Sequence, residues 1–121
     1  MKRPNVIKDK SFRFAVRIVK LYKFLVDNKE FVMSKQLLRS GTSVGALVRE
    51  AEHAESAADF IHKMAIAQKE ANETEYWLEL LFHSKYLEKA QYNSIILDIQ
   101  ELKKILASIL ITSKQKKQDK K

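Results

Sequence analysis

The chain has 121 residues, of which 45% are hydrophobic and 31% are charged, a balance typical of one globular domain rather than of a disordered chain. It contains two glycines, one proline and no cysteine, which excludes disulfides, thiolate metal sites and a cysteine nucleophile, and argues against an all-β fold built on tight turns. The formal net charge is +8, and no apolar run is long enough for a signal peptide or a membrane span, so we expect a cytoplasmic protein without membrane contact.

Two helices are predicted in the first half of the chain. The first runs from about Asp9 to Asn28, because its apolar side chains recur at intervals of four and three residues. The second runs from about Ser34 to Glu55, and serine is a common residue at a helix N-cap. Their predicted core positions are Phe14, Ile18, Leu21 and Leu25, followed by Leu37, Leu38, Val44, Leu47, Val48 and Ala51.

Two further helices are predicted, from near Ser56 to about Ser84 and from about Glu88 to about Ser113. Ser56, with Asp59 three residues later, resembles a capping box. Because the joining segments are short, we expect an all-α, up-down-up-down antiparallel four-helix bundle over residues 1–113. Residues 114–121 have nothing to bury and are predicted to form a basic flexible tail.

Both glycines of the chain, Gly41 and Gly45, lie four residues apart inside the second predicted helix, in the stretch RSGTSVGALVREAEHAES. Glycine costs about 1 kcal/mol relative to alanine in a helix interior, so the pair needs a reason. The small-xxx-small spacing places both on one side of the helix and lets another helix approach closely, which predicts a packing groove. The alternative is a helix break at Gly41.

Two predicted helices carry more apolar surface than one bundle needs. The apolar arc of the first covers roughly 200°, whereas a single bundle buries little more than about 100° of a helix. In the third, Ile66 and Trp77 lie well away from the main apolar face. We expect these surfaces to serve self-association or helix packing, the alternative being a wide core that Trp77 merely flanks.

Positive charge is concentrated at the two ends of the chain. Residues 8–29 carry a net charge of +5 and residues 114–121 carry +4, whereas residues 30–113 carry −3. Lys10, Arg13, Arg17 and Lys20, which we call the basic stripe, fall on one side of the first helix at 3-4-3 spacing. With Lys23, and with Arg39 and Arg49 around the glycines, they are the candidate nucleic-acid-binding residues, since such cations bind phosphates without reading sequence. The alternative is a solvated face in which Arg13 or Arg17 pairs with acids of a neighbouring helix.

Patterns that indicate catalysis are incomplete. Residues 50–53 have the Glu-x-x-His spacing of di-metal bundles and residues 59–62 a variant, but the first helix has no glutamate and acids only at its ends. Residues 41–45 lack the lysine and the strand of a phosphate loop, and no histidine has a pairing that implies a base. We therefore predict no catalytic residues, no metal and no cofactors, and hence no enzyme.

The segments QLLRSGTSVGALVREAEHAESAADFIHK and KEANETEYWLELL resemble the bacterial four-helix bundle proteins encoded in ribosomal-RNA intervening sequences. That family is similar to the accessory variability proteins of diversity-generating retroelements. The resemblance extends to SFRFAVRIVKLYKFL and to residues 95–110, and so covers nearly the whole chain. It implies a four-helix bundle that assembles into a ring, a homopentamer, and binds nucleic acid through basic surface without catalysis. The family often has Asn where this chain has Leu47, so a polar contact made there is lost.

Two functions follow as expectations. The first is a non-enzymatic, homo-oligomeric protein that binds RNA or hybrid duplexes through phosphate contacts from the first helix and the tail, with steep salt dependence. The alternative is a protein-binding adaptor ring that docks a partner such as a reverse transcriptase, as the resemblance implies for the retroelement relatives. In that case Ile66 and Trp77 would matter more than the basic residues.

Overall fold

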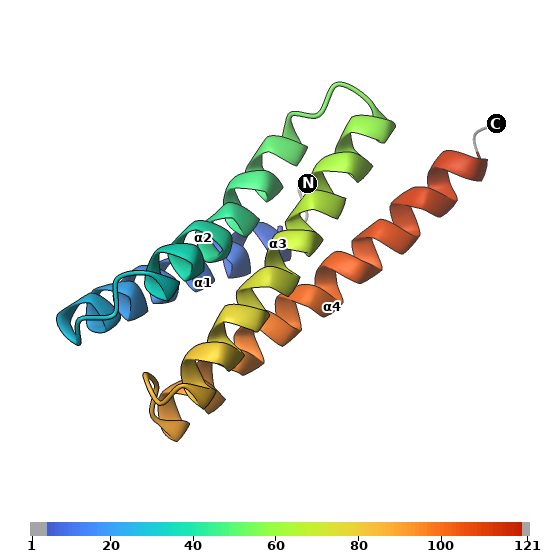
Figure 1. Cartoon of the computed structure of the whole chain (residues 1–121). Coiled ribbons are helices and arrows are strands. Elements are labelled where there is room, and N and C mark those ends of the chain that lie inside the picture. The colour runs from blue at the N-terminus through green and yellow to red at the C-terminus, as the bar shows by residue number, and fades with distance from the viewer. Residues whose placement is uncertain (1–4, 120–121) are drawn as a thin grey trace.

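The structure, a computed structural model, describes residues 5–119 and consists there of four helices and no strand. They are α1 (Val6–Asp27), α2 (Met33–Glu52), α3 (Ala57–His83) and α4 (Lys89–Asp119). Successive helices run antiparallel and are joined by short loops, so the predicted up-down-up-down bundle is confirmed (Figure 1).

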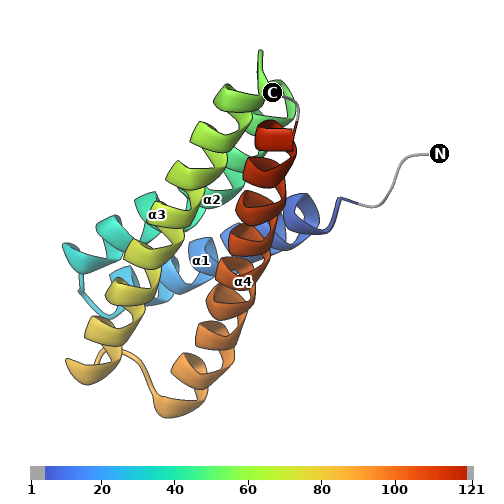
Figure 2. The same ribbon diagram turned by 90° about the vertical axis from the view of Figure 1, so that its right-hand side faces the viewer.

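Each helix packs mainly against its neighbours in chain order. α2 lies between α1 and α3, and α3 packs along α4, whereas the contact between α1 and α4 is the least extensive of the four (Figures 1 and 2). The core between them includes the predicted positions Ile18 and Leu25 from α1, together with Leu78 of α3 and Leu106 of α4, and all four are fully buried. Because α1 and α4 make few contacts, the line along which these two helices meet, which we call the seam, stays accessible to solvent.

The first residues of α1 and α2 differ from the sequence prediction. α1 begins at Val6 rather than near Asp9, and Asn5 caps it by accepting a hydrogen bond from the Lys8 amide. Ser34 does not cap α2, because it lies inside the helix and is buried. The cap is Glu30, whose buried carboxylate accepts the backbone N–H groups of residues 32, 33 and 34 at 3.2, 3.1 and 2.6 Å. A carboxylate at a helix N-terminus also interacts favourably with the helix dipole.

The ends of α1 and α3 share one geometry. Lys29 and Lys85 adopt positive φ angles of 64° and 69°, directly after each helix end. The next residue in each case, Glu30 or Tyr86, donates its N–H to a carbonyl five residues earlier, at 2.9 Å. This is the Schellman motif, with lysine at the left-handed position where glycine is usual.

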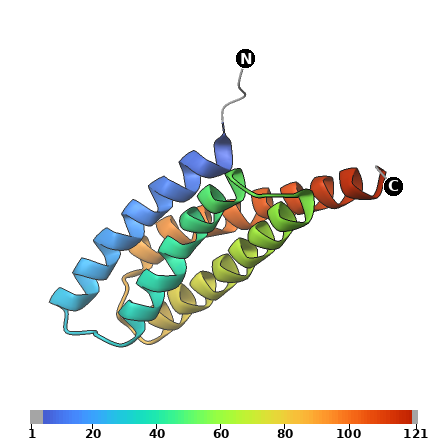
Figure 3. The same ribbon diagram turned by 90° about the horizontal axis from the view of Figure 1, so that it is seen from above.

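The predicted boundary at Ser113 is wrong as a helix end, since α4 continues as a helix through Asp119 (Figure 3). Residues 114–119 are exposed, so this last part of α4 is stabilised by its own backbone hydrogen bonds rather than by burial of side chains. Residues 120 and 121 of the predicted flexible tail, and residues 1–4 of the predicted domain, lie outside the described residues.

Candidate nucleic-acid interface

Two members of the basic stripe are used to join α1 to α4. Lys10 Nζ lies 2.9 Å from Glu101 Oε1. The Arg17 guanidinium pairs with Asp98 and donates a second hydrogen bond to Ser94 Oγ at 2.8 Å. The structure therefore confirms the alternative stated for Arg17, which is an ion pair with an acid of a neighbouring helix.

The rest of the predicted cations of α1 are open. Arg13, Lys20 and Lys23 are exposed, and within residues 5–119 none of them forms an ion pair. We refer to these three residues as the open cations. Within that part of the chain, these cations form no ion pair that an external anion would have to displace, so they are the members of the predicted set most available to phosphates.

Arg39 is part of an ion-pair network with α3. It donates to Glu73 and, at 2.8 Å, to Glu70 Oε1, and these bonds raise its pKa above the ordinary value. Glu73 also accepts the indole N–H of Trp77 at 3.0 Å, and chiefly because of that bond its pKa is lowered. The network joins α2 to α3, so the Arg39 side chain has a structural role that needs no external partner.

Arg49 lies on the other side of α2. Its guanidinium carbon is 5.1 Å from the centre of the Phe12 ring, a cation–π contact between α2 and α1. The Phe12 side chain is 53% exposed, so both groups remain accessible to solvent. Phe12 also forms, with Val16 and Val19, a row of outward-facing apolar residues on α1 that are 53%, 40% and 38% exposed, respectively. We call this row the apolar stripe.

The two glycines face α1. A β-carbon at Gly41 would meet the Ile18 side chain at 2.9 Å, and one at Gly45 would meet the Ser11 carbonyl oxygen at 3.3 Å. α2 is continuous through both positions, so no helix break occurs at Gly41. The groove predicted from their spacing lies inside the protomer, at the α1–α2 contact.

Ile66 and Trp77, predicted from their off-face positions, are half-buried in α3. Trp77 packs against the core and makes an edge-on contact with Tyr76, with ring centres 5.1 Å apart. Ile66 lines a shallow hollow between α2 and α3 together with Leu47. More exposed apolar residues lie on α3 itself, at Tyr76, and on other elements, including the apolar stripe of α1.

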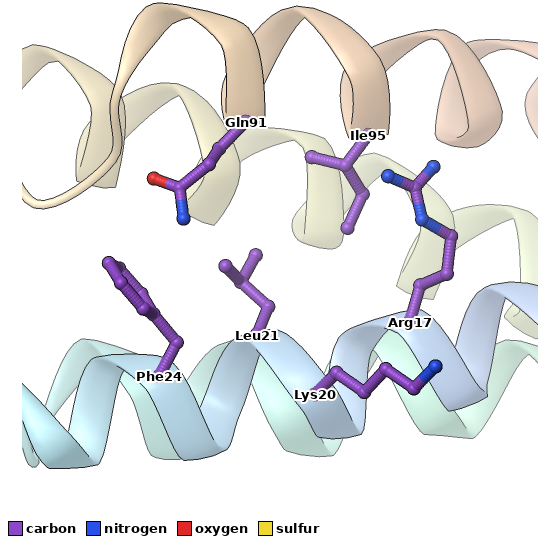
Figure 4. Close-up of a pocket in the computed structure, with 6 residues that line it drawn as sticks. All are labelled: Arg17, Lys20, Leu21, Phe24, Gln91 and Ile95. Carbon is purple, nitrogen blue, oxygen red and sulfur yellow. The ribbon is translucent and has the colours of Figure 1, made fainter.

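A hollow of about 320 Å³ opens on the seam between α1 and α4, and we call it the seam hollow. It is lined by Arg17, Lys20, Leu21, Phe24, Gln91 and Ile95 (Figure 4). Sequence reasoning missed Phe24 and Gln91 as site residues. The available signal was that Phe24 interrupts the otherwise charged arc of α1, whereas nothing in the sequence distinguishes Gln91.

The incomplete metal motifs are not assembled into a cluster. Glu50 pairs with Lys63 at 3.1 Å, and the part of the chain that the structure describes contains no group of three His, Cys, Asp or Glu side chains able to hold a metal ion. Over the same residues, no helix is long and apolar enough to cross a membrane.

Comparison with known proteins identifies the family. The family model described as 23S rRNA-intervening sequence protein matches residues 3–108. A crystal structure of a protein of unknown function from the S23 ribosomal protein family of Bacteroides thetaiotaomicron is 66% identical, with a TM-score of 0.85, and the match covers 86% of this chain and 97% of that one. No curated protein matches. Neither description names an enzymatic activity. The chain thus belongs to the 23S rRNA-intervening sequence protein family.

Proposed function

We propose that this protein is a non-enzymatic RNA-binding protein that contacts phosphates through the open cations of α1. The observation that carries the proposal is that Arg13, Lys20 and Lys23 are exposed on one helix without acidic partners within residues 5–119. The net charge of +8 favours a polyanion, and the family's association with 23S rRNA favours RNA among polyanions.

The C-terminal part of α4 extends the basic surface. Lys114, Lys116 and Lys117 are exposed on the last turns of the helix. These lysines add phosphate contacts that are independent of base sequence. Lys10 and Arg17 contribute less, because Glu101 and Asp98 already neutralise them.

Self-association is the second part of the proposal. Within residues 5–119 the apolar stripe of α1 stays 38–53% exposed, and a second copy that covers it would remove the exposed parts of three large apolar side chains from water. The resemblance to ring-forming relatives implies five copies. A ring would present the open cations of all copies to one RNA, which raises affinity through multivalency.

The proposal is tested by measuring RNA binding over a series of salt concentrations. The variant Arg13→Gln, Lys20→Gln, Lys23→Gln is compared with Lys35→Gln, Lys69→Gln, Lys104→Gln, which removes the same charge from exposed positions on α2, α3 and α4. The first variant should lower the slope of log K against log salt by about one per residue, and the second should leave it nearly unchanged.

Two results would contradict the proposal. One is a wild-type protein that does not bind RNA at low salt, and the other is an equal loss of slope in both variants. A protein-docking ring, for example one that binds a reverse transcriptase, predicts instead that the α1 variant keeps its function.

A further inference from the structure

The seam hollow has an apolar floor, an aromatic wall and a polar mouth. Leu21 and Ile95, both buried, form the floor between α1 and α4. Phe24 is 37% exposed and stands at one end of the hollow, facing Gln91 across the seam (Figure 4). A volume of about 320 Å³ is at the small end of the range for ligand sites, about 300–1,000 Å³, so it fits one ring system rather than a helix or a peptide.

The polar groups at the mouth are hydrogen-bond donors. The Oε1 atom of Gln91 accepts the Glu88 amide N–H at 2.8 Å, and this bond leaves the Nε2 group as the free end. Figure 4 shows that nitrogen directed across the hollow toward α1. Arg17 is held in place by Asp98 and Ser94, and the Lys20 ammonium has no acidic partner within residues 5–119.

A ligand for this hollow must be flat, able to stack, rich in acceptors and attached to negative charge. An unpaired nucleotide has all four properties, because its base has a π-face and edge acceptors and its backbone carries phosphate. A base inside a duplex does not qualify, because its face is already covered by its neighbours.

We infer that the seam hollow binds one unpaired nucleobase of a bound RNA strand, an inference that rests on the proposed RNA-binding function. Phe24 stacks on the face of the base, Gln91 Nε2 donates to an acceptor on its edge, and Lys20 contacts the adjoining phosphate. The open cations hold the flanking backbone, so the protein prefers RNA with a bulge or loop over a continuous duplex.

The test compares two RNA hairpins that are identical except for a single bulged 2-aminopurine. The wild-type protein should bind the bulged hairpin more tightly, and transfer of the probe from its RNA neighbours onto Phe24 should change its fluorescence. Phe24→Leu should weaken binding to the bulged hairpin by about tenfold, the scale of base–aromatic stacking, while leaving the continuous hairpin unaffected. Phe31→Leu, which changes an exposed phenylalanine outside the hollow, is the matched control and should alter neither the affinity nor the fluorescence change.

A second pair of variants tests the donor. Gln91→Glu keeps the oxygen that caps α4 but replaces the free donor with an acceptor, so it should abolish the preference for the bulge. Gln36→Glu makes the same charge change on the exposed surface of α2 and should preserve that preference. Circular dichroism establishes that all variants remain folded.

The outcomes separate this inference from the proposed function. If wild type binds both hairpins equally and with steep salt dependence, and the fluorescence of the probe does not change, RNA binding stands and the base site is overturned. If wild type binds neither hairpin at low salt, both fall. Free adenosine monophosphate should not displace the bulged hairpin at equal concentration. Displacement would mean that the seam hollow binds a free nucleotide rather than a base of an RNA strand, and would overturn the inference.

Discussion

Gly41 of α2 lies directly against Ile18 of α1, so closely that a β-carbon at Gly41 would approach Ile18 Cγ1 to 2.9 Å. Ile18 is fully buried, so a β-carbon at Gly41 would force the Ile18 side chain to shift within the core. The missing side chain at Gly41 therefore sets how near α1 and α2 approach.

We predict that Gly41→Ala destabilises the protein by about 1 kcal/mol. Overpacking a core costs about 1–3 kcal/mol, and the better helix propensity of alanine returns about 1 kcal/mol. Urea unfolding measures the difference. Ala46→Gly, at an exposed position of the same helix, gives the propensity contribution alone. A Gly41→Ala protein stabilised by the full propensity gain would mean that the two helices are not in contact there.

Lys29→Gly should stabilise the protein by about 1 kcal/mol. Lys29 has φ 64°, and a left-handed conformation costs a residue with a β-carbon roughly 1–2 kcal/mol, of which the added freedom of glycine in the unfolded chain cancels part. The thermal midpoint should rise. Lys35→Gly, inside α2, removes the same side chain and should be destabilising, which separates the conformational effect from the loss of charge.

Asp98→Asn should strengthen RNA binding. The Asp98 carboxylate neutralises Arg17, so its removal makes the Arg17 charge available to phosphate and removes a nearby negative charge. The slope of log K against log salt should become steeper by about one. Glu79→Gln, an exposed carboxylate of α3 that forms no ion pair in the described part of the chain, is the control, and an identical effect there would mean that only net charge matters.

The bundle could be predicted from sequence because apolar spacing determines which helix faces are buried, and the glycine pair indicated a close helix contact. The partners of the charged residues could not be predicted. The spacing of the basic stripe places Arg17 and Arg13 on one side of α1, but only the position of α4 determines that Asp98 pairs with Arg17 and that Arg13 forms no ion pair within residues 5–119. The cap of α2 was missed for a similar reason, since Glu30 reaches the helix end from a turn that depends on the left-handed Lys29.

The Glu73 carboxyl should titrate at a lower pH than an ordinary glutamate. The bond from the Trp77 indole is the main cause of its lowered pKa, with Arg39 contributing further. Because the folded-state pKa lies below the unfolded value, this interaction stabilises the protein above the unfolded pKa, and the stabilisation disappears as pH falls through the folded pKa. Trp77→Phe should move the pKa of Glu73 upward, as measured by carbon NMR of the carboxyl group. An unchanged pKa would exclude the indole as its cause.

Replacing the apolar stripe should dissociate the proposed oligomer. Val16→Ser with Val19→Ser removes exposed apolar area from α1 without touching the core, because both side chains point away from it. Light scattering should give a wild-type mass of about 70 kDa, five times the 14.1 kDa of one chain, and the variant should approach the mass of one chain. Leu97→Ser with Ile111→Ser, which are 65% and 61% exposed on α4, is the matched control and should leave the mass unchanged. Dissociation by the α4 pair alone would place the interface on α4 instead, and a wild-type mass of 14.1 kDa would show that the apolar stripe does not mediate self-association.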